Sequence, residues 1–325
     1  MKIGKMICLL CLLALFACTK EKDAAAASNP APVTASEPVQ EPPNIPADTA
    51  PTPTFDANRA MQYVKEIVAI GPRPIGSENH KKVENYILSH LQGDDVENDV
   101  FTIDTSEGKF PVHNIIAKFP GKRDGIIVIA GHYDTNWPLR NINYVGANDG
   151  GSSSALLLEI ANQLRGKAND GCSIWLLWDD AEESMKLPWD DNESLYGVRH
   201  LAEKWQADGT IKKLKAFILE DMIGDADLDI MHDNNSTPWL EDFVYAAATR
   251  LGYQSHFFTL ATEVTDDHMP FIKRGVPSVD LIDFTYGYNN VLWHTDQDTV
   301  DKLSPASLEI VGKVTLETVR LLNKK

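Results

Sequence analysis

The chain is poor in basic residues, poor in cysteine, and has no hydrophobic segment long enough to cross a bilayer. Lys and Arg number 30 against 47 Asp and Glu, which gives a formal net charge of −17 over 325 residues. The aromatic residues are not interleaved with basic runs, so nothing would neutralise a phosphate backbone, and we expect no nucleic-acid partner. No Gly-x-Ser-x-Gly motif occurs, which disfavours serine-hydrolase chemistry.

The first residues have the pattern of a bacterial secretory signal. Lys2 and Lys5 precede an apolar run over residues 6–17, which is too short to span a membrane. Cys18 directly follows the small residue Ala17, which resembles a lipobox. We therefore expect a lipoprotein signal peptide over residues 1–17 and a lipid on Cys18. This lipid would anchor the protein at the bacterial cell envelope, on the periplasmic side or the surface. An ordinary signal peptide cut nearby is the alternative.

The next segment, residues 18–54, is rich in Pro, Ala, Glu and Thr and has no apolar periodicity. Such a segment cannot bury a core, so we expect a disordered tether, followed by one folded domain over residues 55–325. Of the four cysteines, Cys8 and Cys11 leave with the signal and Cys18 carries the lipid. Cys172 therefore has no disulfide partner, and its place at the start of an apolar run predicts a buried thiol.

Downstream of residue 55, segments with helical spacing of apolar residues alternate with short apolar runs typical of strands. The pattern predicts helices over 57–70, 79–91, 153–164, 195–205, 238–251 and 305–322, and strands over 100–105, 112–119, 125–131, 173–178, 215–220 and 278–283. This alternation predicts a three-layer α/β/α domain whose central sheet is mostly parallel and covered on both faces. The consecutive early strands predict an antiparallel pair at one edge, which makes the sheet mixed.

Acidic and imidazole side chains follow several of these strands, at the place where sites form in α/β sheets. His132 and Asp134 are two residues apart, so both side chains point to one side of the chain. Asp149 lies among glycines just before a helix, where it can turn inward or cap that helix. The adjacent carboxylates of Glu182 and Glu183 repel each other unless a cation lies beside them. One can bind metal while its neighbour exchanges protons.

Three further residues complete the set. Asp221 follows the strand over 215–220, Asp266 lies in an Asp-Asp-His sequence, and His294 lies in a loop after the last strand. Asp, Glu and His are the oxygen and nitrogen ligands of catalytic zinc. Taken singly, each motif has an ordinary explanation. His132 and Asp134 could be polar residues at a strand end, Asp149 could cap a helix, and Glu182 and Glu183 could belong to a solvated acidic run. The combination of these motifs predicts a zinc centre with a spare Glu for proton transfer.

The order of these motifs resembles the zinc aminopeptidases of the M28 family and the animal-type glutaminyl-peptide cyclotransferases, which share their fold. The resemblance runs from about Arg73 to the C-terminus. In the peptidases, it implies one zinc on His132, Asp149 and Asp221 and another on Asp149, Glu183 and His294. In the cyclases, it implies a single zinc on Asp149, Glu183 and His294. Whether His132 and Asp134 contact metal or support the site stays open.

Segments outside the metal ligands are more similar to the cyclases. These are residues 194–202 and 266–277, where peptidases more often have Ser at the position of Asp266. Trp189 and Trp293 are similar to cyclase aromatics that wall a small pocket, with core packing as the alternative. One departure is that Ala181 stands where the pattern has Gly. A loop one residue longer before position 194 also makes the correspondence at Trp189 less direct.

The resemblance therefore implies a zinc-dependent enzyme that cyclises the N-terminal glutamine of peptides or proteins to pyroglutamate and releases ammonia. Glu182 would accept and return the proton, and Asp221, held by Asp266, would orient the amine or the leaving nitrogen. The expected partners are peptides with a free N-terminal Gln, and we expect a monomer. The alternatives are a two-zinc aminopeptidase and a catalytically inactive lipoprotein that binds peptides or glycans.

Overall fold

The computed structural model describes residues 34–35 and 49–324. The predicted signal peptide, Cys18 and most of the predicted tether lie outside these residues. The helices are α1 (Ala57–Ile70), α2 (Glu78–His90), α3 (Gly151–Leu164), α4 (Tyr196–Asp208), α5 (Pro238–Leu251), α6 (Met269–Ile272) and α7 (Pro305–Leu322). The strands are β1 (Thr34–Ala35), β2 (Asp95–Thr105), β3 (Gly108–Phe119), β4 (Arg123–His132), β5 (Cys172–Asp179), β6 (Leu214–Asp221), β7 (Ile230–Asp233), β8 (Phe257–Thr262) and β9 (Ser278–Ile282).

The central sheet has six strands in the order β2-β3-β5-β4-β6-β9. Strands β5, β4, β6 and β9 are parallel to one another, whereas β2 and β3 pair antiparallel and β3 joins β5 antiparallel. This arrangement confirms the predicted mixed, mostly parallel sheet with an antiparallel pair at one edge. The carboxyl ends of the four parallel strands consequently share one edge of the sheet.

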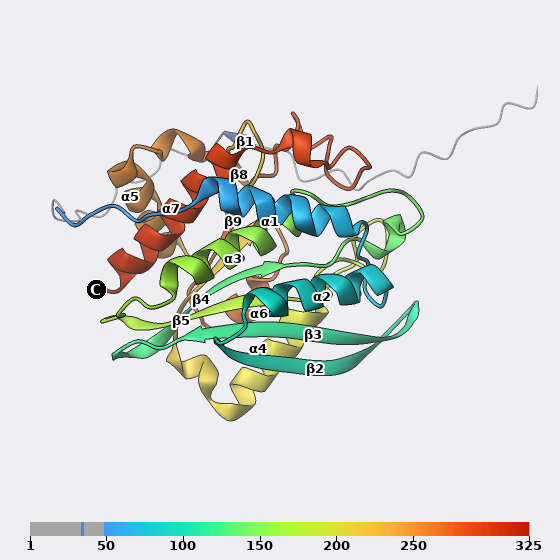
Figure 1. Cartoon of the computed structure of the whole chain (residues 1–325), viewed down its shortest axis with the longest axis horizontal. Coiled ribbons are helices and arrows are strands. Elements are labelled where there is room, and N and C mark those ends of the chain that lie inside the picture. Colours follow the sequence, from blue (N-terminus) through green and yellow to red (C-terminus); the bar gives the residue numbers. More distant parts are fainter. Residues whose placement is uncertain (1–33, 36–48, 325) are drawn as a thin grey trace, which may run out of the picture.

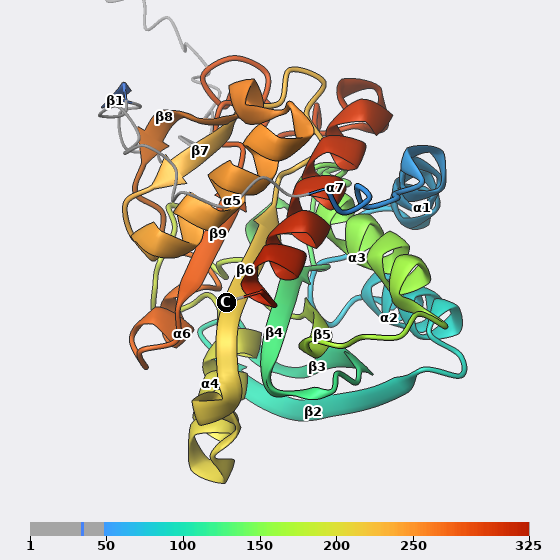
Figure 2. The ribbon, with the colours of Figure 1, turned by 90° about the vertical axis from the view of Figure 1, so that its left-hand side faces the viewer.

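Helices cover both faces of this sheet, as Figures 1 and 2 show: α1, α3 and α7 lie together on one face and α4 on the other. Within β4, Ile127 and Ile129 belong to the apolar core under α1, α3 and α7. Their neighbours Ile126 and Val128 pack with α4 residues such as Trp205 on the opposite face. Because successive side chains of a strand point to opposite faces, a continuous apolar run is the expected sequence of a strand buried on both sides.

A second, smaller sheet has the order β1-β8-β7, with β7 and β8 parallel and β1 antiparallel to β8. The sequence pattern did not predict β7 or β8. β7 has only four residues and ends in His232 and Asp233, so it offers little apolar periodicity. Short strands of this kind depend on tertiary packing more than on their own sequence.

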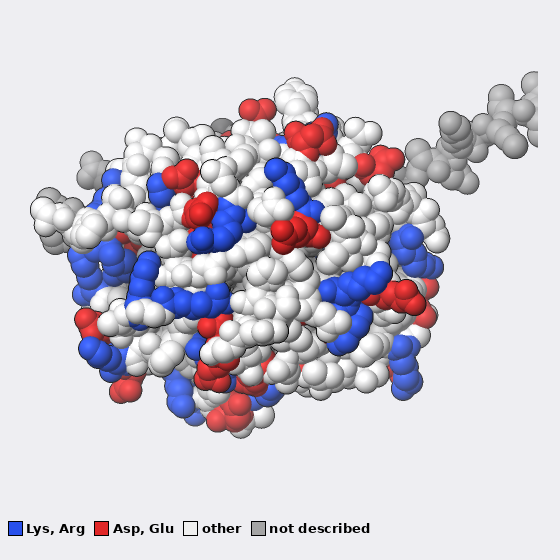
Figure 3. Space-filling model, viewed as in Figure 1, with Lys and Arg blue, Asp and Glu red and all other residues white. Residues whose placement is uncertain are grey.

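Local signals fix the helix ends that the pattern predicted. The Asp56 side chain accepts a hydrogen bond from the Arg59 N–H at the start of α1, and Ser77 caps α2 through the His80 N–H. Cys172 is buried, as predicted, and forms no disulfide among the residues that the structure describes. On the face seen in Figure 3, basic and acidic side chains are interspersed. Within the described residues, no helix has the length and apolarity needed to cross a membrane.

Candidate metal centre and active-site pocket

The candidate site residues meet at the carboxyl ends of the parallel strands. His132 ends β4 and Asp221 ends β6, while Glu182 and Glu183 follow β5. The loop after β9 brings in His294. His132 pairs in register with Asp179, the last residue of β5, so these strand ends are level with one another. The sheet therefore places side chains that are far apart in sequence around one point.

The first candidate metal group consists of Asp149, Glu183 and His294, all buried, with one ligand atom of each within 4.8 Å of the others. His294 Nε2 lies 3.4 Å from Asp149 Oδ2 and 3.1 Å from Glu183 Oε2. Two carboxylates and one imidazole at these separations match a three-ligand catalytic zinc site. The structure thus brings together the three ligands that the sequence predicted for the single zinc of a cyclase.

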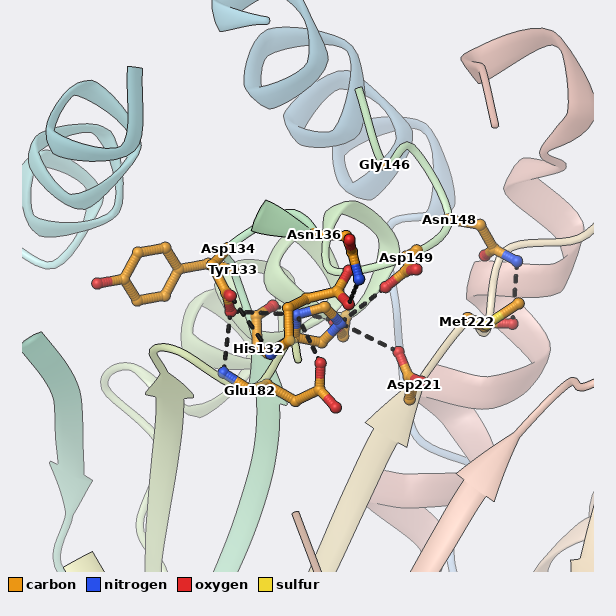
Figure 4. A network of polar contacts seen from close by, with 12 residues as sticks. His132, Tyr133, Asp134, Asn136, Gly146, Asn148, Asp149, Glu182, Asp221 and Met222 are labelled. Carbon is orange, nitrogen blue, oxygen red and sulfur yellow. Dashed lines mark hydrogen bonds and ion pairs between the residues drawn. The ribbon is translucent and has the colours of Figure 1, made fainter. Parts of the chain in front are cut away.

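A second candidate group shares Asp149 and adds His132 and Asp221. His132 Nε2 lies 3.1 Å from Asp149 Oδ1 and 3.3 Å from Asp221 Oδ1. Figure 4 shows the His132 ring at the centre of these contacts, with Asp149 and Asp221 approaching it from different elements. The residues that could hold a second ion are therefore also in place.

The donor set of the first group fits a cation. Within the described part of the chain, Glu183 Oε1 and His294 Nδ1 are buried without a hydrogen-bond partner. Asp221 Oδ1 likewise has no hydrogen-bond partner and lies 3.3 Å from His132 Nε2. Burial would raise the pKa of Asp149, but hydrogen bonds and charge from His132, together with His294, lower it to about 2. Asp149 is therefore ionised, and buried ionised carboxylates are normally paired with cations or metal.

Glu182 and Asp266 are the acids beside the metal group that keep a proton most readily. Burial raises the pKa of Glu182 well above its ordinary value, and the charges of Asp266 and Glu183 raise it further against the opposing effect of His132. Burial and the charge of Asp221 likewise raise the pKa of Asp266 well above its ordinary value. An acid with a raised pKa in a cleft can exchange protons near neutral pH.

Asp134 supports the site through the backbone. Its two carboxylate oxygens accept hydrogen bonds from the N–H groups of Glu182, at 3.2 Å, and Glu183, at 3.4 Å. It also lies 3.5 Å from His132 Nδ1, on the opposite side of the ring from Asp149. The carboxylate therefore holds both the Glu pair and the imidazole in position.

Backbone strain occurs at one site residue and directly beside two others. Ala181, Met222 and His294 have φ values of 58°, 49° and 55°. Ala181 precedes Glu182 and Met222 follows Asp221. Positive φ values are unfavourable for residues with a Cβ and cluster at functional sites. The left-handed conformation also explains why glycine suits position 181 in the related pattern, and the alanine here adopts it despite the cost.

Sequence reasoning missed several residues that fix the Asp149 loop. Arg73 is fully buried, and its guanidinium donates to the carbonyls of Tyr133 at 2.6 Å, of Gly146 at 2.8 Å and of Asp149 at 3.1 Å. The carboxylate of Asp298 accepts the Asp149 N–H at 3.1 Å. No signal in the sequence pointed to Arg73, whose role depends on carbonyls that only the fold brings together. Asp298 lies four residues after His294, a proximity that could have drawn attention to it.

Two more missed residues hydrogen-bond directly to candidate metal ligands. Asn136 donates from Nδ2 to Glu183 Oε2 at 2.7 Å, and the Tyr144 hydroxyl donates to Asp149 Oδ2. Groups that hydrogen-bond to ligands orient them and tune their affinity for metal. Asn136 lies two residues after Asp134, so its place after β4 was the available signal.

A cavity of about 230 Å³ opens onto the ligands and the two acids. Its lining comprises Asp149, Glu182, Glu183, Trp189, Asp191, Asp221, Glu263, Val264, Thr265, Asp266, Ile282, Phe284, Trp293 and His294. Trp293 stacks on His294 with ring centroids 3.9 Å apart and contacts Phe284 at 5.2 Å. Both predicted tryptophans therefore line the pocket, which has an acidic floor and an aromatic wall.

Comparison with known proteins agrees with this geometry. Residues 114–319 match peptidase family M28, and the chain belongs to that family. A glutaminyl cyclase from an Acidobacteriales bacterium is 47% identical in sequence and superimposes with a TM-score of 0.82, covering 86% of this chain and 98% of that chain. The glutaminyl-peptide cyclotransferase of Drosophila melanogaster is 28% identical over an alignment of 265 residues that covers 73% of this chain and 73% of that protein.

A solved structure described as a Zn-dependent exopeptidase from Parabacteroides distasonis is also similar, with 27% identity, a TM-score of 0.74, and coverage of 83% of this chain and 99% of that chain. The resemblance inferred from the sequence, to family M28 and to its glutaminyl cyclase branch, is confirmed.

Proposed function

We propose that this protein is a zinc-dependent glutaminyl-peptide cyclotransferase. It converts the N-terminal glutamine of peptides or proteins to pyroglutamate and releases ammonia. The observation that carries the proposal is one small pocket in which the group Asp149, Glu183 and His294 adjoins the protonatable acids Glu182 and Asp266. The likeness to glutaminyl cyclases over most of the chain supports it.

Zinc fits the donor set described above, and Asp149, Glu183 and His294 would hold one ion. When bound there, zinc supplies a Lewis acid that polarises the γ-amide carbonyl of the substrate glutamine. We also propose that the cyclase binds one zinc ion per chain.

The chain's own residues bind the glutamine and move the proton. The α-amine of the substrate attacks its own γ-carbonyl carbon, so a C–N bond forms as the bond to the amide nitrogen breaks. Glu182 accepts the proton from the amine and returns it to the departing nitrogen, which leaves as ammonia. Asp221, with Asp266 beside it, orients the amine. Trp293 and Trp189 enclose the side chain, which favours the folded geometry that ring closure needs.

Replacement of Glu182 by Gln tests this proposal. The variant keeps the shape of the side chain but cannot accept a proton, so kcat should fall about 100-fold or more. Zinc content, measured by elemental analysis, should stay unchanged, because Glu183 is the ligand. Asp124→Asn, at the other end of β4 from His132, is the matched control and should keep normal turnover. Wild-type turnover by Glu182→Gln would remove this residue from the mechanism.

A two-zinc aminopeptidase is the second candidate, because His132, Asp149 and Asp221 form a second complete metal group. Incubation with Gln-initiated and Leu-initiated peptides, followed by mass spectrometry, separates the two activities. Cyclisation predicts the loss of one ammonia from the Gln peptide only. Release of a free amino acid from either peptide, with two zinc ions per chain, would favour hydrolysis.

We also propose that the enzyme acts as a monomer at the cell envelope, anchored through a lipid on Cys18. The support is the charged start, short apolar run and small residue before Cys18. Cys18→Ser should release the protein from the membrane fraction of expressing cells, whereas Cys172→Ser should not. Retention of Cys18→Ser in that fraction would contradict the anchor.

A further inference from the structure

The mouth of the pocket carries two exposed carboxylates, Asp191 and Glu263, from separate loops. Asp191 lies in the loop between β5 and α4, and Glu263 directly follows β8. Within residues 49–324, neither carboxylate forms an ion pair with a Lys, Arg or His. No described Lys or Arg lines the cavity either. A ligand that enters therefore passes two carboxylates without an ion-pair partner before it reaches the acidic floor.

Asp191 is held in place rather than free to swing away. The indole N–H of Trp189 donates to Asp191 Oδ1 at 2.9 Å, so the carboxylate and the aromatic wall form one unit. A charge fixed at a pocket mouth loses less side-chain entropy on binding a cation than a mobile one does. The geometry thus favours recognition of a positive group next to Trp189.

A second surface hollow continues from the pocket, since Trp189 and Asp191 line both. The two basic residues of this hollow are already paired with acids. Lys186 lies 3.3 Å from Asp190 Oδ2, and Arg140 lies 3.9 Å from Glu107 Oε2. Arg199 lies beside this loop, where its guanidinium donates to the backbone carbonyls of Asp191 at 3.1 Å and Asn192 at 3.4 Å, and it forms no ion pair with the Asp191 carboxylate. A peptide that leaves the pocket past Trp189 therefore meets the Asp191 carboxylate without a cationic partner.

We infer that the enzyme selects N-terminal glutamine peptides with Lys or Arg at one of the two positions after the glutamine. This inference rests on the proposed function and adds a substrate class to it. The glutamine fills the pocket, and the following residues pass the mouth, where Asp191 and Glu263 attract an ammonium or guanidinium group. An acidic residue at the same position of the peptide would be repelled by these two carboxylates.

The effect is moderate because the mouth is exposed. A solvent-exposed charge pair changes affinity by at most about five-fold, and added salt screens it. Two carboxylates therefore predict a preference of about 3- to 10-fold in kcat/KM, expressed mainly in KM. Raising the ionic strength from low to about 1 M should remove most of the preference.

The test compares two peptides that differ only in charge: Gln-Lys-Ala-Ala and the same peptide with acetylated lysine. The wild-type enzyme should cyclise the charged peptide about 3- to 10-fold more efficiently at low salt. In the double variant Asp191→Asn, Glu263→Gln, this ratio should fall to about one. The Asn side chain can still accept the Trp189 hydrogen bond, so the wall stays in place. The control Asp124→Asn removes a charge at the far end of β4 and should leave the ratio unchanged.

The outcomes separate the two proposals. If neither peptide is cyclised by the wild-type enzyme, the proposed function fails. If both are cyclised with equal efficiency at low salt, the selection for basic residues is wrong while the cyclase activity stands. The inference is also overturned if the preference for the charged peptide persists in the double variant, or if it does not fall when salt is added. In either case these carboxylates would not be its source.

Discussion

Asp298 is the residue whose replacement most directly tests how the metal group is built. Its carboxylate is fully buried and accepts hydrogen bonds from the Asn148 N–H at 2.8 Å, the Asp149 N–H at 3.1 Å and the Tyr286 hydroxyl at 2.7 Å. Asp149 belongs to both candidate metal groups, so a shift of its backbone moves a ligand of each. The variant Asp298→Asn is nearly isosteric but replaces one acceptor oxygen by an N–H₂ donor.

At least one of these hydrogen bonds must then be lost. Burial and the charge of Asp149 raise the pKa of Asp298 to about 7, so the carboxyl is partly protonated near neutral pH. The lost hydrogen bond contributes about 0.5–1.5 kcal/mol, and the buried N–H left unpaired costs about 1–3 kcal/mol more. We therefore expect Asp298→Asn to lower the free energy of unfolding by about 2–4 kcal/mol. Groups that orient ligands typically change metal affinity by about 10- to 100-fold, so zinc should bind more weakly by that factor.

The assay pairs urea unfolding with zinc competition against a chelator of known affinity. Glu159→Gln is the matched control, because Glu159 is another buried carboxylate and accepts the Asp56 N–H at 3.1 Å and Arg59 Nε at 2.6 Å, two turns into α3. It should lose stability without a change in zinc affinity. If Asp298→Asn binds zinc as tightly as the wild type while losing as much stability as the control, Asp298 does not orient Asp149 and the reasoning fails.

Three further predictions concern the same framework. Removal of metal by a chelator should lower the melting temperature reversibly, because zinc that binds only the native state at about 100 times its Kd adds about 2.7 kcal/mol; a melting curve that chelator and added zinc leave unmoved would contradict a resident ion. Arg73→Lys should lose about 3 kcal/mol or more and weaken zinc binding, since one ammonium cannot reach the carbonyls that the guanidinium holds; urea unfolding of the variant at wild-type stability would refute this. Burial would lower the pKa of His80, but the charge and hydrogen bond of Asp180, with Glu84, raise it to about 10. Its folded-state pKa lies above the unfolded value of 6.5, so this stabilisation is complete below about pH 6.5 and is lost as the pH rises toward 10. The stability difference between wild type and His80→Asn should shrink over that range, and a difference that stays constant with pH would count against it.

The parts of the fold that the sequence predicted are those with strong local patterns. The buried strands β4, β5 and β6 are continuous apolar runs, and α1, α5 and α7 have the predicted bounds. The sequence pattern did not predict strands β7 and β8, because they are short and their pairing is decided by neighbours distant in sequence. Periodicity reports which faces are buried but carries little information about a four-residue strand.

The same division holds for the site. Residues that bind or exchange through their own side chains, such as Glu183 and His294, stand out because acids and imidazoles at strand ends are chemically conspicuous. Arg73 and Asp298 act on backbone carbonyls and amides, whose positions are set only once the chain has folded. A side chain that binds backbone groups has no characteristic spacing from other residues, so a sequence motif cannot reveal it.

The glycines behind the metal group limit how this pocket can change. A methyl group at Gly150 would lie 2.8 Å from the Asp134 carbonyl oxygen and 2.9 Å from the His132 ring, and one at Gly146 would lie 2.5 Å from the Asp149 carbonyl oxygen. Main-chain oxygens and the His132 ring therefore leave no room for a side chain at either glycine. A substitution at either glycine would displace the Asp149 loop or the His132 ring. A pocket for a bulkier first residue would instead have to come from shortening lining side chains such as Trp293 or Phe284.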